Sequence, residues 1–467
     1  MPLPVISVAQ MRDWEQRTWD AGVVEESVMS NAGQAVAQMA LEMTPEGGMI
    51  LLLAGKGNNG GDARIAAEHL PGRSREVIDA SDPVSGLRDF NRALEQSPDL
   101  IVDGLFGIGL DRDLDEDHCE LVRAINQTQL PVLAVDAPSG LNADTGQPMG
   151  AAIQARCTVT LGLPKAGLLK PSADDFVGTL EVAHRIGLID DLPTSDQLWL
   201  RANDLNGMPP TRPPSGHKGA FGHVGIIAGS TGYHGAACLC ARGALRARPG
   251  LVSVFTPAYQ AVAAQLQSPM VHPWNTDVTQ PLSSCTALVV GPGLAGPDVP
   301  ESLRNVVREL WRESASPIIA DASALDWLPA GEVPENAIRI LTPHPGEAAR
   351  LLDCEPSEIQ RDRLIATRKL AEIHRATIVL KGRHTMIGQG DGPVLVNSTG
   401  NSGLGQGGSG DVLAGFLGGF LAQPQFHDRV IQAAAYAVWQ HGHAADRLEA
   451  TGRYWGMDAL IDALAGD

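Results

Sequence analysis

The feature that most constrains the fold is a series of short apolar runs that alternate with helical segments. Residues 49–54, Met-Ile-Leu-Leu-Leu-Ala, carry no polar side chain, and similar runs cover 100–102, 131–135 and 158–161. A strand with one solvent-exposed face alternates apolar and polar residues, whereas a strand buried on both faces is apolar throughout. The runs therefore predict a parallel sheet with helices on both faces.

A second series of apolar runs predicts a second sheet. Its members lie at 223–228, 251–255, 287–290, 317–320, 338–341 and 377–380. A chain of 467 residues is also too long for one ordinary core. We therefore expect an α/β protein with two three-layer αβα domains, at 1–191 and 198–467, joined by a linker at 192–197.

Charge and composition limit the partners of the chain. The formal net charge of −19 opposes long-range attraction to nucleic acid or to anionic membranes. The N-terminus lacks a basic segment followed by an apolar run, and the most apolar stretch, 412–422, is too short to span a bilayer. The six cysteines show no paired metal-ligand spacing. We expect a cytoplasmic protein with reduced cysteines and with no nucleic-acid or membrane partner.

Polar residues gather where three strands of the first series end. The run 49–54 leads into a glycine-rich segment at 55–62, after which we expect a helix over Arg64–Leu70, and the next two runs end at Asp103 and Asp136. Each feature alone has a plain explanation, because a glycine-rich segment can be a tight turn and a strand-end aspartate usually caps a turn. Together they place amides and carboxylates at the carboxyl edge of the sheet, where open α/β sheets bind ligands.

Three stretches in this region resemble the NAD(P)H-hydrate epimerases. They are Gly-Asn-Asn-Gly-Gly-Asp at 57–62, Val-Asp-Gly-Leu-Phe-Gly-Ile-Gly at 102–109 and Val-Asp-Ala-Pro-Ser-Gly at 135–140. The resemblance implies a Rossmann-like domain that interconverts the R and S epimers of hydrated NADH and NADPH (NADHX and NADPHX) at C6. It implies Asp136 as the catalytic acid/base, since a carboxylate can move the proton that this reaction requires.

The same resemblance implies further ligands of the first domain. A potassium ion would be bound by Asn59, Asp103 and Ser139, whose oxygens suit a hard cation. The substrate would contact Asn58, Asn59, Gly60, Gly61, Asp62, Gly107, Ile108, Gly109, Leu110, Asp111, Arg112, Asp113 and Asp136.

Two positions depart from the epimerase pattern. Ala63 stands where the family usually has glycine, and Ser30 stands where it usually has glutamate. If position 63 needs a backbone angle that only glycine adopts, epimerase activity would be weakened or lost.

The second domain carries a glycine-rich segment directly before an apolar helix. Residues 397–411 end in Gly-Gly-Ser-Gly-Asp, which predicts backbone N–H groups at a helix N-terminus with Asp411 beside them. Such an arrangement can stabilise a transferring phosphoryl group while the carboxylate accepts a hydroxyl proton. The plain alternative is a flexible glycine loop capped by Asp411.

This motif resembles the phosphoryl-transfer loop of ribokinase-like kinases. Further stretches narrow the resemblance to the ADP/ATP-dependent NAD(P)H-hydrate dehydratases, namely 217–222, 290–294, 342–347 and 380–385. The resemblance implies Asp411 as the catalytic residue. It implies a hydrate pocket lined by Ala236, Gly293, His344 and Asp411. It implies nucleotide binding by Lys381, Gly382, Arg383, His384, Thr385 and Gly410.

Taken together, the two resemblances imply a bifunctional lyase and isomerase. The second domain would phosphorylate the C6 hydroxyl of S-NAD(P)HX with ADP or ATP and Mg²⁺, after which phosphate leaves and NAD(P)H is restored. The alternative is a ribokinase-like small-molecule kinase with a non-catalytic N-terminal binding module. His344 can also simply cap a helix starting near Gly346, and Lys381 can be a solvated charge. The amphipathic segment 7–20 makes a homo-oligomer our expectation.

Overall fold

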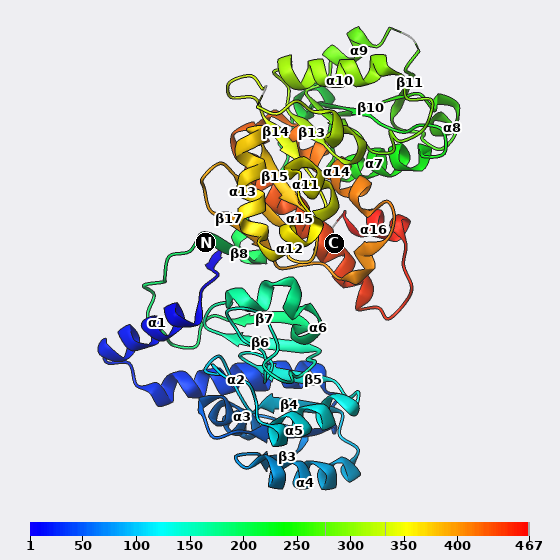
Figure 1. Cartoon of the computed structure of the whole chain (residues 1–467). Coiled ribbons are helices and arrows are strands. Elements are labelled where there is room, and N and C mark those ends of the chain that lie inside the picture. Colours follow the sequence, from blue (N-terminus) through cyan, green and yellow to red (C-terminus); the bar gives the residue numbers. More distant parts are fainter. Residues whose placement is uncertain (276, 332, 466–467) are drawn as a thin grey trace. The chain divides into compact units, whose positions relative to one another are not determined.

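The computed structural model describes residues 1–275, 277–331 and 333–465. The chain forms two compact units, Leu3–Asp196 and Gln197–Asp467, and Met1–Pro2 belong with the second (Figure 1). The junction between Asp196 and Gln197 lies inside the segment expected to be the linker.

The N-terminal unit is built around a parallel sheet. Its strands are β2 (Met49–Ala54), β3 (Ser74–Asp79), β4 (Leu100–Gly104), β5 (Val132–Val135), β6 (Cys157–Leu161) and β7 (Thr179–Ala183). Its helices are α1 (Val8–Asp20), α2 (Glu25–Met43), α3 (Asn58–Glu68), α4 (Pro83–Ala93), α5 (Glu116–Gln127) and α6 (Asp174–Val177), and β1 (Leu3–Pro4) precedes them. The strand order is β3-β2-β4-β5-β6-β7, with every neighbouring pair parallel.

Both faces of this sheet are covered, as the continuous apolar runs predicted. Ile50 and Leu52 pack with α2 and α3, whereas Leu51 and Leu53 pack with α4 and α5 on the opposite face. The chain leaves β2 toward β3 on one side and later returns to β4 on the other. Open α/β sheets bind ligands in the crevice that such a reversal opens at the carboxyl ends of the strands.

The C-terminal unit is built around a larger sheet. Its strands are β8 (Gln197–Leu200), β9 (His223–Ile227), β10 (Leu251–Thr256), β11 (Met270–Pro273), β12 (Ala287–Val290), β13 (Ile318–Ala320), β14 (Arg339–Leu341), β15 (Thr377–Leu380), β16 (Met386–Gln389) and β17 (Val394–Asn397). Within this unit the order is β8-β17-β16-β15-β14-β13-β12-β9-β10-β11. The strand reversal falls between β9 and β12, and the antiparallel pairs are β15–β16 and β16–β17.

Helices cover this second sheet on both faces (Figure 1). They are α7 (His234–Arg246), α8 (Tyr259–Ala263), α9 (Thr279–Ser283), α10 (Glu301–Glu313), α11 (Pro345–Leu352), α12 (Pro356–Arg361), α13 (Arg363–His374), α14 (Ser409–Leu421), α15 (Val430–Glu449) and α16 (Met457–Ala463). One core cluster joins α7, α14, α15 and α16 to strands β9, β10 and β12. Almost every residue of α14 is buried, which explains why its sequence is apolar on all sides.

The strands that the sequence did not reveal lie toward the sheet edges. β3 has the sequence Ser-Arg-Glu-Val-Ile-Asp and buries only Ile78 of its side chains. β7, β8 and β11 were missed as well, and each lies at or next to an edge of its sheet. β16 and β17 were also missed, although most of their residues are buried. An edge strand needs no continuous apolar run, because part of its surface faces water.

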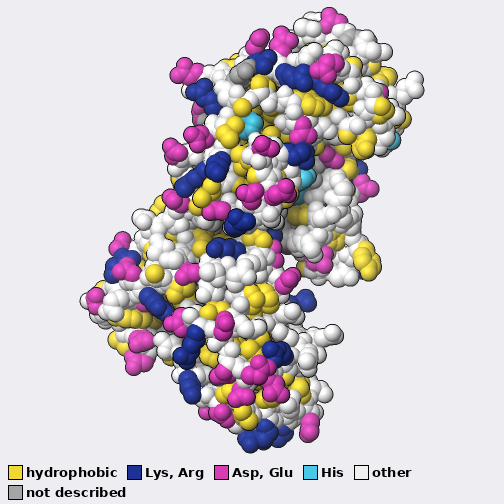
Figure 2. All heavy atoms as spheres, in the orientation of Figure 1, with side chains coloured by type: hydrophobic (Ala, Val, Ile, Leu, Met, Phe, Trp, Pro, Cys, Tyr) yellow, Lys and Arg dark blue, Asp and Glu magenta, His cyan; other side chains and the backbone are white. Residues whose placement is uncertain are grey.

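Among the described residues, no helix is long and apolar enough to cross a membrane. Figure 2 shows acidic and basic side chains interspersed over the visible face rather than gathered into one basic patch.

Close glycine packing fixes α14 against α7. A Cβ on Gly415 would lie 1.9 Å from the carbonyl oxygen of Cys240, and one on Gly419 would lie 2.4 Å from that of Ala244. The matching glycine on α7, Gly243, would place its Cβ 2.4 Å from the carbonyl oxygen of Val412. The two helices can approach this closely only because no side chain lies between their backbones.

We predict that Gly415→Ala lowers the free energy of unfolding of the C-terminal unit by about 1–3 kcal/mol or more, because backbone atoms must move to admit the methyl group. Gly235 on α7 is the matched control, since a Cβ there meets nothing within 4 Å. Gly235→Ala should leave stability unchanged or raise it by up to about 1 kcal/mol. Urea unfolding followed by tryptophan fluorescence measures both, and equal stabilities would contradict the proposed packing.

Candidate active sites

The glycine-rich segment after β2 forms the start of a helix. α3 begins at Asn58, earlier than the expected start near Arg64, with Gly57 as its N-cap. Gly60 makes this possible, because a Cβ there would lie 2.1 Å from the carbonyl oxygen of Gly55. The expected loop is therefore the first turn of α3, which directs its free backbone N–H groups toward the carboxyl edge of the sheet.

A cleft of about 960 Å³ lies at this edge of the first sheet. Most of the predicted substrate contacts line it, namely Asn58, Asn59, Asp62, Gly107, Ile108, Gly109, Leu110, Asp111, Arg112, Asp113 and Asp136. Gly60 and Gly61 do not. Gly60 packs on the backbone of Gly55, and the α carbon of Gly61 faces the sulfur of Met29.

Asp136 is held in one orientation by contacts to a single oxygen. Its Oδ1 accepts hydrogen bonds from Lys165 Nζ at 2.6 Å, from Leu161 N at 3.0 Å and from Thr160 Oγ1 at 3.3 Å. Its backbone has a φ of +61°, an unusual conformation for a residue with a side chain. Lys165 is fully buried, so this ion pair is shielded from water.

Asp62 lies in the same cleft without such a cation. Its side chain is buried, and among the described residues no Lys, Arg or His forms an ion pair with it. Burial, and then repulsion from Asp136 and Glu15, raise the pKa of Asp62 to about 8. Burial and Asp136 also raise the pKa of Glu15. The cleft thus pairs one anchored carboxylate with neighbours that tend to keep their protons.

The three residues predicted to bind potassium also lie together. Asp103 is completely buried and accepts two hydrogen bonds from Ser139. Ser139 Oγ donates to Asp103 Oδ1 at 2.6 Å, and Ser139 N donates to Asp103 Oδ2 at 2.8 Å. Burial raises the pKa of Asp103 to about 6, against the opposing effect of these hydrogen bonds. Asn59 Oδ1 lies 3.0 Å from the position that a Cβ on Gly107 would occupy, and Asn59 Nδ2 has no partner among the described residues.

The two departures from the family pattern do not distort the cleft. Ala63 is fully buried inside α3 and is not among the residues with positive φ, so its backbone does not require glycine. Its methyl group packs against Gly104, where a Cβ would lie 2.6 Å away. Ser30 lies on α2 outside the residues that line the cleft. The backbone at position 63 therefore gives no reason to expect that alanine weakens epimerase activity.

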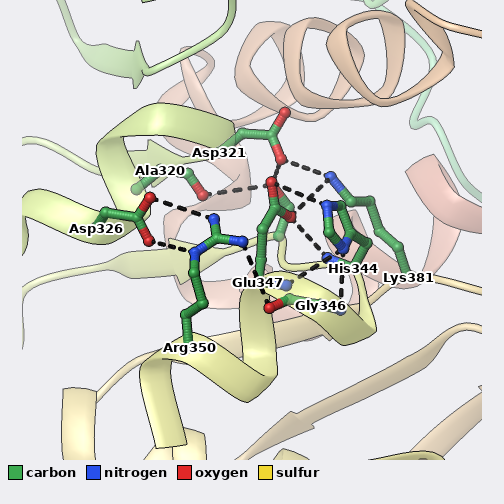
Figure 3. A network of polar contacts seen from close by, with 9 residues as sticks. Ala320, Asp321, Asp326, His344, Gly346, Glu347, Arg350 and Lys381 are labelled. Atoms are coloured by element: carbon green, nitrogen blue, oxygen red, sulfur yellow. Dashed lines mark hydrogen bonds and ion pairs between the residues drawn. The ribbon is translucent and has the colours of Figure 1, made fainter. Parts of the chain in front are cut away.

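The C-terminal site is organised around Lys381, which follows β15 (Figure 3). Its Nζ donates to Asp321 Oδ1 at 2.6 Å and lies 3.9 Å from Glu347 Oε2. Thr342 Oγ1 donates to the same Asp321 oxygen at 2.7 Å. These residues follow the neighbouring strands β13, β14 and β15, which explains how distant parts of the sequence meet.

His344 caps α11, as its simpler interpretation predicted. Its Nδ1 accepts hydrogen bonds from the backbone N of Gly346 at 3.0 Å and of Glu347 at 3.2 Å (Figure 3). In return Glu347 Oε2 accepts from His344 N at 2.8 Å. The imidazole is about half exposed, so the capping role leaves its outer face accessible.

Asp411 lies in the first turn of α14, beside the Lys381 ammonium group. The helix is capped by Gly408 at a φ of +101°, and a Cβ on Gly410 would lie 3.3 Å from Lys381 Nζ. Burial, then repulsion from Asp321, raise the pKa of Asp411 to about 7 against the attraction of Lys381. The site therefore combines a helix N-terminus, a lysine and a carboxyl group that titrates near neutrality, which suits proton transfer during phosphoryl transfer.

Two residues predicted for the hydrate pocket are in direct contact. Gly293 follows β12 with a φ of +64°, and a Cβ on it would lie 2.7 Å from the Cβ of Ala236 on α7. Its carbonyl oxygen accepts a hydrogen bond from Ser230 Oγ at 2.6 Å. This contact lies at the strand reversal between β9 and β12, where such sheets bind ligands.

The segment predicted to bind nucleotide forms the turn between β15 and β16. Gly382 has a φ of +136°, and Thr385 Oγ1 donates to its carbonyl oxygen at 2.9 Å. Arg383 is exposed. His384 lies against the Trp199 ring, with centroids 5.3 Å apart, and burial lowers its pKa to about 3. His384 is therefore a neutral residue that packs against Trp199. Lys381 and Gly410, in contrast, lie next to each other in the site.

Sequence reasoning missed several residues that organise the two sites. Asp321 follows strand β13 just as Asp136 follows β5, and Asp103 lies near the end of β4, so the same signal was available for Asp321. Lys165 and Glu15 carried no such signal, because one lies four residues beyond a strand and the other on an amphipathic helix.

Comparison with known proteins identifies the family of each domain. Residues 224–464 match the family model described as NAD(P)H-hydrate dehydratase, and residues 25–95 and 78–167 match the one described as YjeF-related protein N-terminus. The bifunctional NAD(P)H-hydrate repair enzyme of Coxiella burnetii is 34% identical over 96% of this chain and 95% of its own length. The corresponding enzyme of Vibrio cholerae is 36% identical over 96% of this chain and 94% of its own length.

Solved structures match the C-terminal unit. The ADP/ATP-dependent NAD(P)H-hydrate dehydratase of Bacillus subtilis, crystallised with ATP and Mg²⁺, is 29% identical with a TM-score of 0.50, covering 56% of this chain and 94% of that one. A ribokinase-like superfamily protein from Enterococcus faecalis is 26% identical with a TM-score of 0.50, and the match covers 59% of this chain and 97% of that one.

The fold and the two sites define a two-domain α/β enzyme with a ribokinase-like C-terminal domain. The chain belongs to the family of bifunctional NAD(P)H-hydrate repair enzymes, in which an epimerase domain is joined to a dehydratase domain. The predicted fold class and family are confirmed, and the small-molecule kinase with a non-catalytic N-terminal module is the less favoured alternative.

The buried acid Asp62 generates a prediction about stability. Its folded-state pKa, about 8, lies above its ordinary value of 3.8, so the folded domain retains a proton that the unfolded chain loses between about pH 4 and 8. Stability must therefore fall as the pH rises through this window. We predict that Asp62→Asn stabilises the N-terminal domain more at pH 8 than at pH 5.

Hydrogen exchange of peptides from β2 and α3, compared between variant and wild type at the same pH, measures this difference. Asp79→Asn is the control, because the pKa of Asp79 is lowered by its hydrogen bonds to Ser81 and it stays ionised throughout the window. Equal protection of the Asp62 variant and wild type at both pH values would contradict the prediction.

Proposed function

We propose that this chain repairs hydrated NADH and NADPH, with Asp136 serving epimerisation in the N-terminal cleft and Asp411 serving nucleotide-dependent dehydration in the C-terminal site. The observation that carries the proposal is the position of Asp411 in the first turn of α14, beside Lys381. Phosphoryl transfer requires a proton acceptor next to positively polarised groups, and this turn provides both.

In the dehydratase site, Asp411 accepts the proton of the C6 hydroxyl while the oxygen attacks the terminal phosphorus of ADP or ATP. The bond from that phosphorus to the bridging oxygen breaks, and AMP or ADP leaves. The carboxylate form needed for this step predominates above pH of about 7. The backbone N–H groups at the start of α14 and Lys381 stabilise the negative charge that develops on the phosphoryl oxygens. The C6–O bond then breaks with its electron pair going to phosphate, which leaves far more readily than hydroxide, while the N1 lone pair forms an iminium ion. Loss of a proton from C5 forms the C5=C6 double bond and restores the dihydropyridine ring. Gly293, Ala236 and His344 are proposed to hold the hydrated ring.

The nucleotide is proposed to lie along residues 381–385 and Gly410. Among the described residues no group of three or more His, Cys, Asp or Glu side chains converges to hold a metal. Mg²⁺ usually takes one or two carboxylates together with substrate phosphates, so the Asp321 and Glu347 oxygens fit it as partial ligands. It would neutralise the charge on the phosphates.

Potassium fits the first domain for an electrostatic reason. Asp103 is fully buried, and among the described residues no cationic side chain forms an ion pair with it. A bound cation would supply the missing charge, and Asn59 and Ser139 would complete an oxygen-rich site. Such an ion would hold the loop after β4 against the start of α3.

Cytoplasmic location and homo-oligomerisation remain proposals. All six cysteines are free, which suits a reducing compartment. The apolar face of α1, on which the oligomer was expected, packs within its own domain instead. Trp14 on that face is buried, and its Nε1 donates to Ile189 O at 3.0 Å.

Recovery of reduced-nicotinamide absorbance from mixed NADHX epimers, with Mg²⁺ and ADP or ATP, tests the proposed function. Wild type should restore the full absorbance, and the two donors run in parallel identify the preferred one. Asp411→Asn should lower the dehydration rate by about 10²–10⁴-fold because the proton acceptor is lost. With Asp136→Asn, the rapid recovery of absorbance should stop once the S epimer initially present is consumed. Further recovery should proceed only as fast as the R epimer converts spontaneously to S.

Each result has a clear meaning. No recovery by wild type with either donor would favour the small-molecule kinase. Full recovery by Asp136→Asn at the wild-type rate would make the N-terminal domain a non-catalytic module.

The proposed potassium site gives a separate prediction. Epimerisation should slow when K⁺ is replaced by tetramethylammonium, and Asp103→Asn should weaken activation by K⁺ by about tenfold or more, because it removes the only charged ligand. Asp79→Asn, which alters an exposed strand-end aspartate, should respond to K⁺ as wild type does. An epimerisation rate independent of K⁺ in wild type would remove the ion from the proposal.

A further inference from the structure

Lys165 was assigned no role by the sequence or by the family resemblance, yet its charge is completely enclosed in the N-terminal site. Its side chain has no solvent exposure. Its Nζ donates to Asp136 Oδ1 at 2.6 Å, to Leu161 O at 2.7 Å and to Thr160 Oγ1 at 3.1 Å. An ammonium group has three N–H donors, and all three are used. Lys165 therefore has no donor left for a substrate and acts through Asp136.

The two carboxylate oxygens of Asp136 have different surroundings. Lys165, Leu161 and Thr160 all donate to Oδ1, and among the described residues none donates to Oδ2. Asp136 also lines the cleft, so Oδ2 is the oxygen available to a substrate. An ammonium group in contact with a carboxylate favours the charged form of that carboxylate. Asp136 is thus arranged as a proton acceptor.

Asp62 has the opposite environment in the same cleft. It is buried, lines the cleft from the first turns of α3, and forms no ion pair among the described residues. A carboxyl group that is buried without a cation, near an ionised carboxylate, retains its proton. Its raised pKa, about 8, agrees with this placement. Two carboxyl groups whose surroundings separate their protonation states are suited to act as acid and base.

We propose that Asp136 and Asp62 form a proton-transfer pair in the N-terminal cleft, with Asp136 as the acceptor held by the positioning residue Lys165 and Asp62 as the neutral donor. The pair would open and reclose the hydrated ring at its C6–N1 bond. This inference rests on the proposed epimerase function.

The chemistry of the substrate requires two such groups. C6 carries both a hydroxyl group and the ring nitrogen N1. Asp136 takes the hydroxyl proton, the O–H electron pair becomes the second bond of an aldehyde, and the C6–N1 bond breaks with its electron pair moving to N1. Asp62 gives N1 its proton. Rotation about the C5–C6 bond then presents the other face of the aldehyde, and N1 attacks it.

Ring closure reverses both transfers. Asp62 takes its proton back from N1, and Asp136 returns its proton to the oxygen, so both groups recover their starting states. The overall reaction needs no oxidant, no reductant and no net uptake of protons. The cleft also holds ionisable groups that set the local potential, namely Arg12, Glu15, Glu25, Lys56, Asp111, Arg112, Asp113, Asp115 and His118.

The test uses the full chain, purified R epimer of NADHX and no nucleotide, so that only epimerisation proceeds. Chromatography follows the formation of S epimer above the spontaneous rate between pH 5 and 9. For wild type we expect the rate to fall above pH of about 8, where Asp62 loses its proton. Asp62→Asn should lower kcat by about 10²–10⁴-fold and remove this alkaline fall.

Lys165→Met should shift the acid side of the pH profile upward by about one to three pH units, because Asp136 loses its cation. Lys165→Arg should restore the wild-type profile, since it keeps the charge. Thr160→Val is the matched control, because it removes an uncharged hydrogen bond to the same Oδ1 and should leave the profile in place. If Lys165→Met does not fold, the Asp62→Asn profile still decides the proposal.

Three outcomes would overturn the inference. The first is an Asp62→Asn variant with a raised KM, an unchanged kcat and the wild-type alkaline fall, which would make Asp62 a binding residue only. The second is a folded Lys165→Met variant whose pH profile matches wild type. The third is a wild type without epimerisation above the spontaneous rate, which would refute the proposed epimerase function itself and this inference with it.

Discussion

A lysine ammonium group paired with a strand-end aspartate is the interaction on which each site depends, with the lysine fully buried in the N-terminal site and partly exposed in the C-terminal one. Lys165 meets Asp136 in the N-terminal domain and Lys381 meets Asp321 in the C-terminal domain, both at 2.6 Å. In water such a pair contributes little, because solvent screens it. At the buried carboxyl edge of a parallel sheet the same pair is shielded, and removing one partner would leave an uncompensated charge. Each lysine therefore compensates the charge of one strand-end carboxylate, while a second carboxyl group in the same site lacks such a direct partner.

The carboxyl groups without a direct lysine partner are consequently the ones that titrate near neutrality. The pKa of Asp62 is raised to about 8 and that of Asp411 to about 7, mainly by burial and then by a nearby carboxylate. Groups with such values can exchange protons at physiological pH, whereas an ordinary exposed aspartate is fully ionised there. The same arrangement also destabilises the folded state as the pH rises, because each buried acid resists ionisation. Reactivity and lower stability thus have one physical origin.

How much could be predicted from the sequence follows from which residues face water. The apolar runs at 49–54 and 223–228 predicted central strands, because burial on both faces leaves no alternation. The edge strand β3 has a mostly polar sequence and gave no such signal. Asp103, Asp136 and Asp411 were predictable because strand ends and helix starts can be recognised locally. Lys165 could not be found in this way, because its role comes only from a contact with Asp136, 29 residues away in sequence.

The helix boundaries show the same limit. The expected start of α3 near Arg64 was wrong by six residues, since Gly60 and Gly61 look like loop residues in sequence. In the fold, Gly60 lets the helix backbone contact Gly55, and the helix N-terminus extends to the cleft. The glycines of 57–62 and of 407–410 therefore serve a common purpose. They remove side chains where a helix begins directly over the carboxyl edge of a sheet, so that its N–H groups and its first acidic side chain lie at the same edge. A sequence pattern with glycines just before an aspartate is thus a signature of close approach, and the buried lysine that controls the nearby charge must come from the tertiary fold.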